Sequence, residues 1–309
     1  MTKIFIDGSA GTTGLRIRER LSSRKDLTLI TLPEEVRKDP AARADALNAS
    51  DIAFLCLPDA AAVEAVSLVT SPDTVIIDTS TAHRTADGWT YGFPELKEMR
   101  ERIAASKRIA NPGCHASGFI ALIAPLVDAG LISTDARLSC FSLTGYSGGG
   151  KKMIAEYEGA DRSALLDAPR QYGLSQNHKH LPEMAKNCCL LYPPVFCPIV
   201  APYYAGMEVT VPLTRRETFA SPDEIRQVYR DYYLSGLVHF SDSPDEDGFL
   251  SAGAMAGRDD MEVSVFGNAE RMLLTARFDN LGKGASGAAI QNMNIVMGLD
   301  EKTGLEVGE

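Results

Sequence analysis

The stretch Lys3–Leu21 reads KIFIDGSAGTTGLRIRERL and decides the fold. Residues 3–6 are a short, mostly apolar run, as expected of a buried strand. Glycines follow at positions 8, 11 and 14, and the apolar residues from Leu15 onward recur at helical spacing. The order strand, glycine turn, helix is typical of a unit that holds a dinucleotide pyrophosphate on backbone N–H groups. The residues expected to form that cofactor loop are Gly8, Ser9, Ala10, Gly11, Thr12, Thr13 and Gly14.

A glycine-rich turn alone can also be purely structural, but later segments repeat the strand–helix pattern. Further strands are predicted at Leu27–Leu32, Asp51–Leu57, Thr74–Asp78 and Arg108–Ala110, with a helix over Ala60–Val69. Alternation of this kind predicts an α/β fold with a Rossmann-type, doubly wound parallel sheet. Ligands of such sheets bind beyond the carboxyl ends of the strands.

The segment after the second strand bears on the choice of cofactor. An NAD site usually has an acidic residue at that strand end, for the ribose 2′-hydroxyl. Here no acid stands directly at the strand end, and Arg37 and Lys38 lie close by. Glu34 and Glu35 in the same segment argue the other way. On balance the segment favours NADP.

Cys114 is the candidate nucleophile. It follows Asn-Pro-Gly and precedes the apolar stretch 115–126, which is predicted to be a helix. A cysteine at a helix N-terminus is favoured as a thiolate, because backbone N–H groups and the helix dipole stabilise its negative charge. A thiolate can attack an acyl carbon. A buried structural cysteine is the alternative.

The 309 residues are predicted to form two domains. Residues 1–113 with 285–309 are expected to make the NADP-binding Rossmann domain. Residues 114–284 are expected to make an α+β catalytic and dimerisation domain, with strands at 207–211 and 271–278 and a loop at 241–247.

Composition excludes some classes of function. A net charge of -10 argues against binding nucleic acid or an anionic membrane. No segment reaches the roughly 18 apolar residues of a membrane span. The N-terminus lacks the apolar core of a signal peptide, and the six cysteines form no CxxC pair. A cytoplasmic protein that acts on a small molecule is therefore expected.

Two short motifs suggest other ligands. Gly145–Lys151 fits the start of a P-loop, but Lys152 stands where Ser or Thr would hold magnesium. His178 and His180 lie near Cys188 and Cys189, but this spacing suits zinc poorly. We therefore expect neither a nucleoside triphosphate nor a metal ion to be bound.

Six motifs, in order, resemble the N-acetyl-gamma-glutamyl-phosphate reductases, in particular the shorter of the two types of this family in the aspartate-semialdehyde dehydrogenase-like superfamily. They are the glycine loop at 8–14, DTSTAHR at 78–84, YGFPE at 91–95, NPGC at 111–114, HKHLPE at 178–183, and NLGKGASG at 280–287 with QNMN at 291–294. Two stretches differ from the usual pattern. His115, Ala116 and Ser117 stand where the family commonly has Tyr or Phe, a small residue and Thr. His83 replaces an aromatic residue and Ala82 replaces an acid.

The resemblance implies an NADPH-dependent phosphorylating aldehyde dehydrogenase of arginine biosynthesis. It would reduce N-acetyl-L-glutamyl 5-phosphate to N-acetyl-L-glutamate 5-semialdehyde and phosphate, through a thioester on Cys114. His180, with His178 close by, would be the acid/base, and the protein would be a homodimer or homotetramer. Further cofactor contacts implied are Ser80, Asn280 and Gly282; the implied substrate contacts are Arg84, Asn111, Ser147, Gly148 and Lys151.

Spacing alone leaves the roles of the two histidines open. At i and i+2 on an extended segment they would point to opposite faces, so that at most one faces Cys114. Two rival functions also stay open at this point. One is a sister reductase acting on aspartyl or aminoadipyl phosphate, and the other is a non-catalytic NADPH sensor that would not need Cys114.

Overall fold

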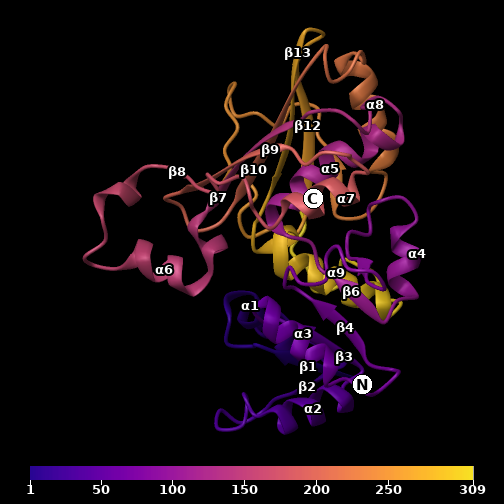
Figure 1. Ribbon diagram of the computed structural model, residues 1–309, viewed down its shortest axis with the longest axis vertical. Helices are drawn as coiled ribbons and strands as arrows, with labels where there is room; N and C mark the ends of the chain where they lie inside the picture. Colours follow the sequence, from indigo (N-terminus) through magenta and orange to yellow (C-terminus); the bar gives the residue numbers. More distant parts are fainter. Residues whose placement is uncertain (309) are drawn as a thin grey trace. The chain divides into compact units, whose positions relative to one another are not determined.

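The computed structural model describes residues 1–308, and these divide into two compact units (Figure 1). Unit 1 comprises Met1–Pro112 and Ala285–Leu305. Unit 2 comprises Gly113–Gly284 and residues 306–308. The last segment joins unit 2 because the backbone N–H of Glu306 donates to Asp259 Oδ2 at 2.9 Å.

Unit 1 contains a six-stranded sheet in which every pair of neighbouring strands is parallel. The predicted doubly wound parallel sheet is thereby confirmed. In sheet order the strands are β2 (Leu27–Ile30), β1 (Thr2–Asp7), β3 (Ile52–Leu55), β4 (Val75–Asp78), β6 (Arg108–Ala110) and β5 (Thr90–Tyr91). The helices are α1 (Thr12–Ser22), α2 (Pro40–Ala49), α3 (Asp59–Ser67), α4 (Met99–Ala104) and α9 (Gly287–Val296).

The strand order changes direction at β1. From β1 the chain passes to β2 on one side, and then crosses to β3 on the other side of β1. Such a switch point opens a crevice at the carboxyl ends of the strands. The glycine loop leaves β1 at this point, so the topology of unit 1 places this loop at the crevice.

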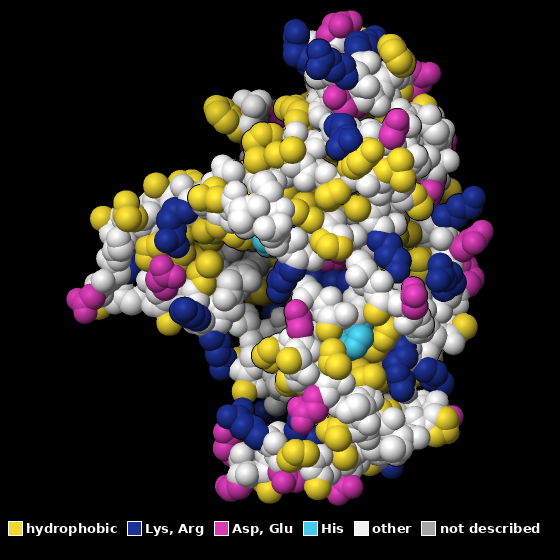
Figure 2. All heavy atoms as spheres, viewed as in Figure 1, with side chains coloured by type: hydrophobic (Ala, Val, Ile, Leu, Met, Phe, Trp, Pro, Cys, Tyr) yellow, Lys and Arg dark blue, Asp and Glu magenta, His cyan; other side chains and the backbone are white. Residues whose placement is uncertain are grey.

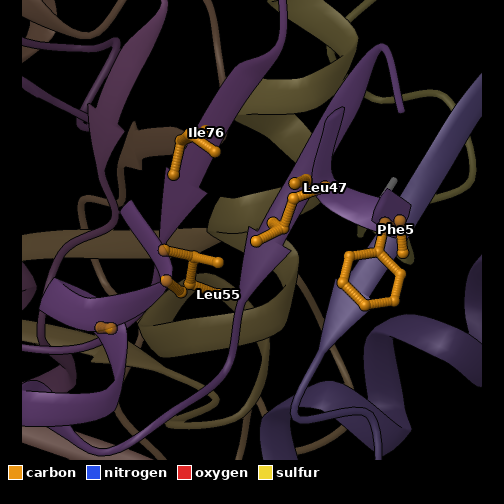
Figure 3. Close-up of a cluster of buried hydrophobic side chains, with 8 residues drawn as sticks. Phe5, Leu47, Leu55 and Ile76 are labelled. Carbon is orange, nitrogen blue, oxygen red and sulfur yellow. The ribbon is translucent and has the colours of Figure 1, made fainter. Parts of the chain in front are cut away.

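The core on one face of this sheet consists of apolar side chains from strands and helices together. Phe5, Leu47, Leu55 and Ile76 come from β1, α2, β3 and β4, and each is at most 4% exposed (Figure 3). Full burial of one such side chain contributes about 1.5–3 kcal/mol to stability. Every residue of β3 and β4 is buried, as expected of central parallel strands.

Unit 2 contains a seven-stranded mixed sheet. In sheet order its strands are β11 (Val238–Phe240), β12 (Met261–Asn268), β13 (Arg271–Phe278), β10 (Met207–Thr214), β7 (Ser139–Gly145), β9 (Val195–Ala201) and β8 (Arg170–Gln171). The helices are α5 (Cys114–Asp128), α6 (Gly150–Glu158), α7 (Leu181–Asn187) and α8 (Pro222–Tyr232).

Helix α5 lies against the middle of this sheet. A Cβ added at Gly118 would lie 2.5 Å from the Val209 side chain on β10, so the helix and the strand are in close contact. Pro125, inside α5, cannot donate a hydrogen bond to the carbonyl of Ala121. The Tyr233 hydroxyl donates to that carbonyl instead, at 2.6 Å, so the segment that follows α8 supplies the missing donor.

The opposite face of the sheet carries exposed apolar side chains. The register pairs Phe141 with Thr210 and Leu273 with Pro212, which puts all four on the face away from α5. Phe141, Val195 and Leu273 are 42%, 58% and 46% exposed. This open face is a candidate contact surface.

Candidate active site

Cys114 is the first residue of α5. Its N-cap, Gly113, is extended and offers no side-chain cap, and the first turn of α5 holds no acidic residue. The backbone N–H groups of that turn, with the helix dipole, therefore favour a negative charge on the half-buried Cys114 sulfur. A Cβ added at Gly284 would lie 3.0 Å from Cys114 Cβ, so the chain after β13 passes close beside the thiol.

Three imidazoles gather beside the start of α5. The ring centroids of His178 and His180 are 4.8 Å apart, and His115 lies 5.9 Å from the first and 5.6 Å from the second. The expectation that His178 and His180 point to opposite faces is therefore wrong. The segment is not extended: His180 has φ -82° and ψ -13°, because it is already the N-cap of α7.

The two candidate acid/base residues differ in environment. His180 is 5% exposed, whereas His178 is only partly buried. The backbone N–H of His180 donates to His178 Nδ1 at 3.2 Å, so the backbone of His180 orients the ring of His178. Burial, and then the charge of Lys179, lower the pKa of His178, which keeps it a neutral imidazole near pH 7.

Two further side chains of the cluster, His115 and Tyr172, were not predicted as site residues. His115 Nε2 lies 2.6 Å from the Tyr172 hydroxyl, and its Nδ1 lies 2.6 Å from Ser142 Oγ. Burial, followed by the charge of Cys114, raises the pKa of Tyr172. Nothing in the spacing of Tyr172 marks it as a neighbour of His115; only its position six residues before His178 offers a signal.

Glu183 was also missed as a site residue. It lies on α7, is 1% exposed, and its Oε1 accepts a hydrogen bond from the backbone N–H of Gly113 at 2.7 Å. The motif HKHLPE contains it, so the sequence pointed to the segment but not to this role.

Ser147, Gly148 and Asn280 lie together in unit 2. Asn280 Nδ2 donates to Ser147 Oγ at 3.0 Å, and Asn280 Oδ1 accepts from the backbone N–H of Gly206. A Cβ added at Gly148 would lie 3.5 Å from Asn280 Nδ2. Two predicted substrate contacts and one predicted cofactor contact therefore share one polar cluster.

The remaining predicted contacts of unit 2 lie in different settings. Lys151 is exposed on α6, within a lobe formed by residues 146–172. In Figure 2 this lobe, on the left, shows Lys and Arg side chains beside apolar ones. Gly282 packs against another segment, since a Cβ there would lie 2.0 Å from the carbonyl oxygen of Arg258.

The glycine loop of unit 1 fits a pyrophosphate. Gly8 has φ +85°, and a Cβ there would lie 2.3 Å from the Cys56 carbonyl oxygen; at Gly14 it would lie 2.5 Å from the Gly8 carbonyl oxygen. The N-cap of α1 has no side-chain cap, and its first turn holds no acid. Thr12 Oγ1 is buried with no hydrogen-bond partner among residues 1–308. Such an atom suits a phosphate oxygen, and these residues would hold the cofactor.

Asp78 organises the carboxyl end of β4. Its carboxylate accepts hydrogen bonds from the backbone N–H and the hydroxyl of Ser80, at 2.9 and 2.7 Å. It also contacts His83 Nδ1 at 2.6 Å, and the His83 ring stacks on Trp89. The polar groups of Ser80 are thus used to build this turn.

Arg84 and Asn111 are joined in unit 1. Arg84 Nε donates to the Asn111 carbonyl oxygen at 2.9 Å, and its Nη2 donates to the Thr79 carbonyl oxygen at 3.0 Å. The Asn111 side chain donates to Ala285 O and accepts from Asn292 Nδ2. Both residues therefore fix the backbone that leads to Cys114.

Both units match known domain families. Residues 33–106 match the family described as semialdehyde dehydrogenase, NAD binding domain, and residues 114–280 match the semialdehyde dehydrogenase dimerisation domain. Within residues 1–308, no helix is long and apolar enough to cross a bilayer. No group of three His, Cys, Asp or Glu side chains in that range could hold a metal ion.

Relatives match along the whole chain. A protein of Nostoc sp. named N-acetyl-gamma-glutamyl-phosphate reductase 2 is 46% identical over 318 residues, covering 98% of this chain and 99% of the relative. A protein of the same name from Pseudomonas putida is 44% identical over 304 residues, covering 96% of each.

Solved structures show the same fold at lower identity. Aspartate semialdehyde dehydrogenase II of Vibrio cholerae superposes with a TM-score of 0.73 at 17% identity, covering 96% of this chain and 98% of that one. The aspartate semialdehyde dehydrogenase of Candida albicans, solved with NADP, gives a TM-score of 0.68 at 17% identity and the same coverage.

Proposed function

The chain belongs to the N-acetyl-gamma-glutamyl-phosphate reductase family of NADP-dependent oxidoreductases in arginine biosynthesis, and we propose Cys114 as its nucleophile. The reaction is the reduction of N-acetyl-L-glutamyl 5-phosphate to N-acetyl-L-glutamate 5-semialdehyde and phosphate. The observation that carries the assignment of Cys114 is its place at the N-terminus of α5, beside a cluster of imidazoles.

In the acylation step, the Cys114 sulfur attacks the carbonyl carbon of the acyl phosphate. The carbon–oxygen bond to phosphate breaks, phosphate leaves with the electron pair, and a thioester remains. His180 takes the thiol proton, because a neutral imidazole is an effective base near pH 7. Backbone N–H groups at the start of α5 stabilise the carbonyl oxygen while it carries negative charge.

The reduction step needs a dinucleotide, which the glycine loop and Thr12 would hold by its pyrophosphate. When bound, NADPH supplies the hydride that reduces the thioester carbonyl. His180 returns its proton to the sulfur when the carbon–sulfur bond breaks and the aldehyde leaves. Further proposed cofactor contacts are Ser80, Asn280 and Gly282.

Anionic groups of the substrate require cations and N–H donors. Lys151 and Arg84 are the proposed cations, since an ammonium and a guanidinium both suit phosphate or carboxylate oxygens. Ser147 and Gly148 are the proposed neutral contacts, next to Asn280. Asn111 contributes by position, because its side chain is already hydrogen-bonded.

The match of unit 2 to a dimerisation domain indicates an oligomer that acts on a small molecule. The finer proposal is a homodimer, or a homotetramer built from it, in which the open face with Phe141, Val195 and Leu273 is covered by a second copy. Burial of these side chains would remove an exposed apolar patch from water. We place the enzyme in the cytoplasm, with the other steps of amino-acid biosynthesis.

The test follows the reverse reaction, because the acyl phosphate is labile. Purified protein is given N-acetyl-glutamate semialdehyde, phosphate and NADP, and NADPH formation is recorded at 340 nm beside the Cys114→Ser variant. Phosphate-dependent turnover that the variant loses supports both substrate and nucleophile. Turnover with aspartate semialdehyde instead would mean that the enzyme catalyses the sister reaction. Full activity of the Cys114→Ser variant would mean that Cys114 is not the nucleophile.

A further inference from the structure

The outer edge of β9 is covered by backbone at one end and by a side chain at the other. Strand β8 pairs with this edge at Val200 and Ile199. The carbonyl oxygen of Pro198 accepts from the backbone N–H of Tyr172 at 3.0 Å. Proline has no N–H to donate, which suits it to an edge strand. Two positions earlier, Phe196 turns its N–H and C=O to the same edge, because the direction of these groups alternates along a strand.

The side chain of Gln176 covers this edge at Phe196. Its Nε2 donates to the Phe196 carbonyl oxygen at 2.7 Å, and its Oε1 accepts from the Phe196 backbone N–H at 2.9 Å. A neighbouring strand would make the same two bonds, so the carboxamide takes the place of a strand residue. It satisfies both backbone groups of a residue that is only 1% exposed.

Gln176 has a backbone conformation that its residue type rarely adopts. Its φ is +56°, in the left-handed region. It ends a turn that begins at Gly173, whose carbonyl oxygen accepts from the Gln176 N–H at 3.0 Å. Gln176 is exposed, so burial does not impose this strain, and the two bonds to Phe196 hold the residue in place. Strained residues of this kind persist where the surrounding contacts determine them, and they gather at functional sites.

The turn lies against the imidazole cluster. His178 follows Gln176 by two residues, and its ring centroid is 5.1 Å from that of Phe196. A Cβ added at Gly173 would lie 3.2 Å from Pro198 Cγ and 3.8 Å from His178 Cδ2, so the turn contacts both β9 and the ring. Phe196 therefore receives the two bonds of Gln176 on its backbone and packs against His178 with its side chain.

We propose that Gln176 is a positioning residue for the two histidines, because it holds the turn before His178 against β9 and so fixes where that imidazole lies. The position is passed on to His180, whose backbone N–H donates to His178 Nδ1. The catalytic consequence rests on the proposed role of His180 as acid/base. Gln176 acts through Phe196 and His178 rather than by contact with the substrate.

The first test compares kcat with the KM for NADP in the reverse reaction. Gln176→Ala removes both bonds to Phe196, and Gln176→Gly removes them while relieving the left-handed strain. Both variants should lower kcat about tenfold, because a displaced acid/base transfers protons poorly. The KM for NADP should stay within about twofold, since the glycine loop belongs to unit 1.

Gln227→Ala is the matched control. It makes the same exchange on α8, where the Gln227 amide donates to Asp231 on the surface, and it should leave both constants unchanged. Thermal melts confirm that each variant is folded at the assay temperature.

The second test reports the position of His178 without catalysis. The proton–carbon NMR signal of the His178 imidazole, identified by its absence in His178→Gln, is recorded at mildly alkaline pH, where the ring is neutral. The ring current of Phe196 contributes to the chemical shift of this signal, since the two rings are in contact. The signal should therefore move in Gln176→Ala and in Gln176→Gly, but not in Gln227→Ala.

An unmoved His178 signal in folded Gln176→Ala would overturn the proposal, and so would a wild-type kcat in either variant. A wild-type kcat in Gln176→Gly would mean that the backbone of the turn, and not the carboxamide, fixes the histidines. Failure of the proposed function looks different. In that case neither semialdehyde gives phosphate-dependent turnover in the wild-type protein, while the His178 signal still moves in the Gln176 variants.

Discussion

Glu183 Oε1 accepts a hydrogen bond from the backbone N–H of Gly113 at 2.7 Å, although the two residues are 70 positions apart. The bond ties the residue before Cys114 to α7, whose N-cap is His180. The proposed nucleophile, Cys114, and the proposed acid/base, His180, are thereby held by neighbouring helices of one unit, and the carboxylate of Glu183 links the two helix starts.

The Glu183 link can be tested with two variants. Glu183→Ala should lower kcat by at least tenfold and destabilise the fold by about 1–3 kcal/mol, because a buried N–H loses its acceptor. Glu183→Gln keeps an acceptor oxygen and should retain most of the stability. Urea unfolding and steady-state kinetics check both; equal stability of the two variants would contradict the role given to this bond.

The cofactor loop should not tolerate a side chain at Gly14. Gly14→Ala puts a Cβ only 2.5 Å from the carbonyl oxygen of Gly8, so the loop must open. We expect binding of NADPH, measured by fluorescence titration, to weaken at least tenfold. Gly253→Ala is the control, since its nearest neighbour would be 3.7 Å away. Unchanged binding in Gly14→Ala would place the cofactor elsewhere.

Acid should destabilise the protein through His115. Folding lowers the pKa of His115 from 6.5 to about 3, so between these pH values the imidazole is protonated in the unfolded chain and neutral in the native state. The contribution of His115 to the free energy of unfolding is fully present above pH 6.5 and is lost as the pH falls toward 3. The loss between pH 7 and pH 5 is about 2 kcal/mol. Urea unfolding at the two pH values should show a smaller difference in His115→Gln. An identical difference in the variant would mean that other groups account for the acid sensitivity.

The open face of unit 2 should control assembly. Phe141→Glu brings a charge into the middle of the exposed apolar surface, and we expect light scattering to report a smaller particle than for the wild type. Leu165→Glu, on a side chain that is 77% exposed in the lobe, should leave the mass unchanged. Should Phe141→Glu keep the wild-type mass, the subunit contact must lie on another surface.

The sequence predicts most of unit 1, because the apolar runs of β1, β3 and β4 and the glycine turn are local signals. Helix α2 was not predicted. Its apolar residues are weakly segregated, and its strongest mark is the start, where Asp39 caps Ala42 and Pro40 occupies the first turn. This start signal is local and can be read from the sequence.

The site was predicted less completely, because it depends on contacts distant in sequence. Cys114 is proposed as the nucleophile from its predicted place at a helix start, and the structure puts it at the first residue of α5. The His178–His180 pair was identified, but its geometry was predicted wrongly, since an extended segment was assumed where α7 begins. No spacing rule could bring Tyr172 to His115, 57 residues away, because that contact is made by the sheet that carries β8 and β7.

Pro125 and Tyr233 have a consequence for how sequences of this kind can diverge. The proline leaves the Ala121 carbonyl without its helical donor, and the tyrosine hydroxyl supplies one from 112 residues away. The two positions are therefore expected to covary. A homologue that replaces Pro125 with alanine regains the backbone N–H and can then exchange Tyr233 for phenylalanine. If Tyr233 is replaced while Pro125 is still present, the buried carbonyl of Ala121 is left unpaired. The order of these two substitutions is therefore constrained: the change at Pro125 in α5 must precede the change at Tyr233.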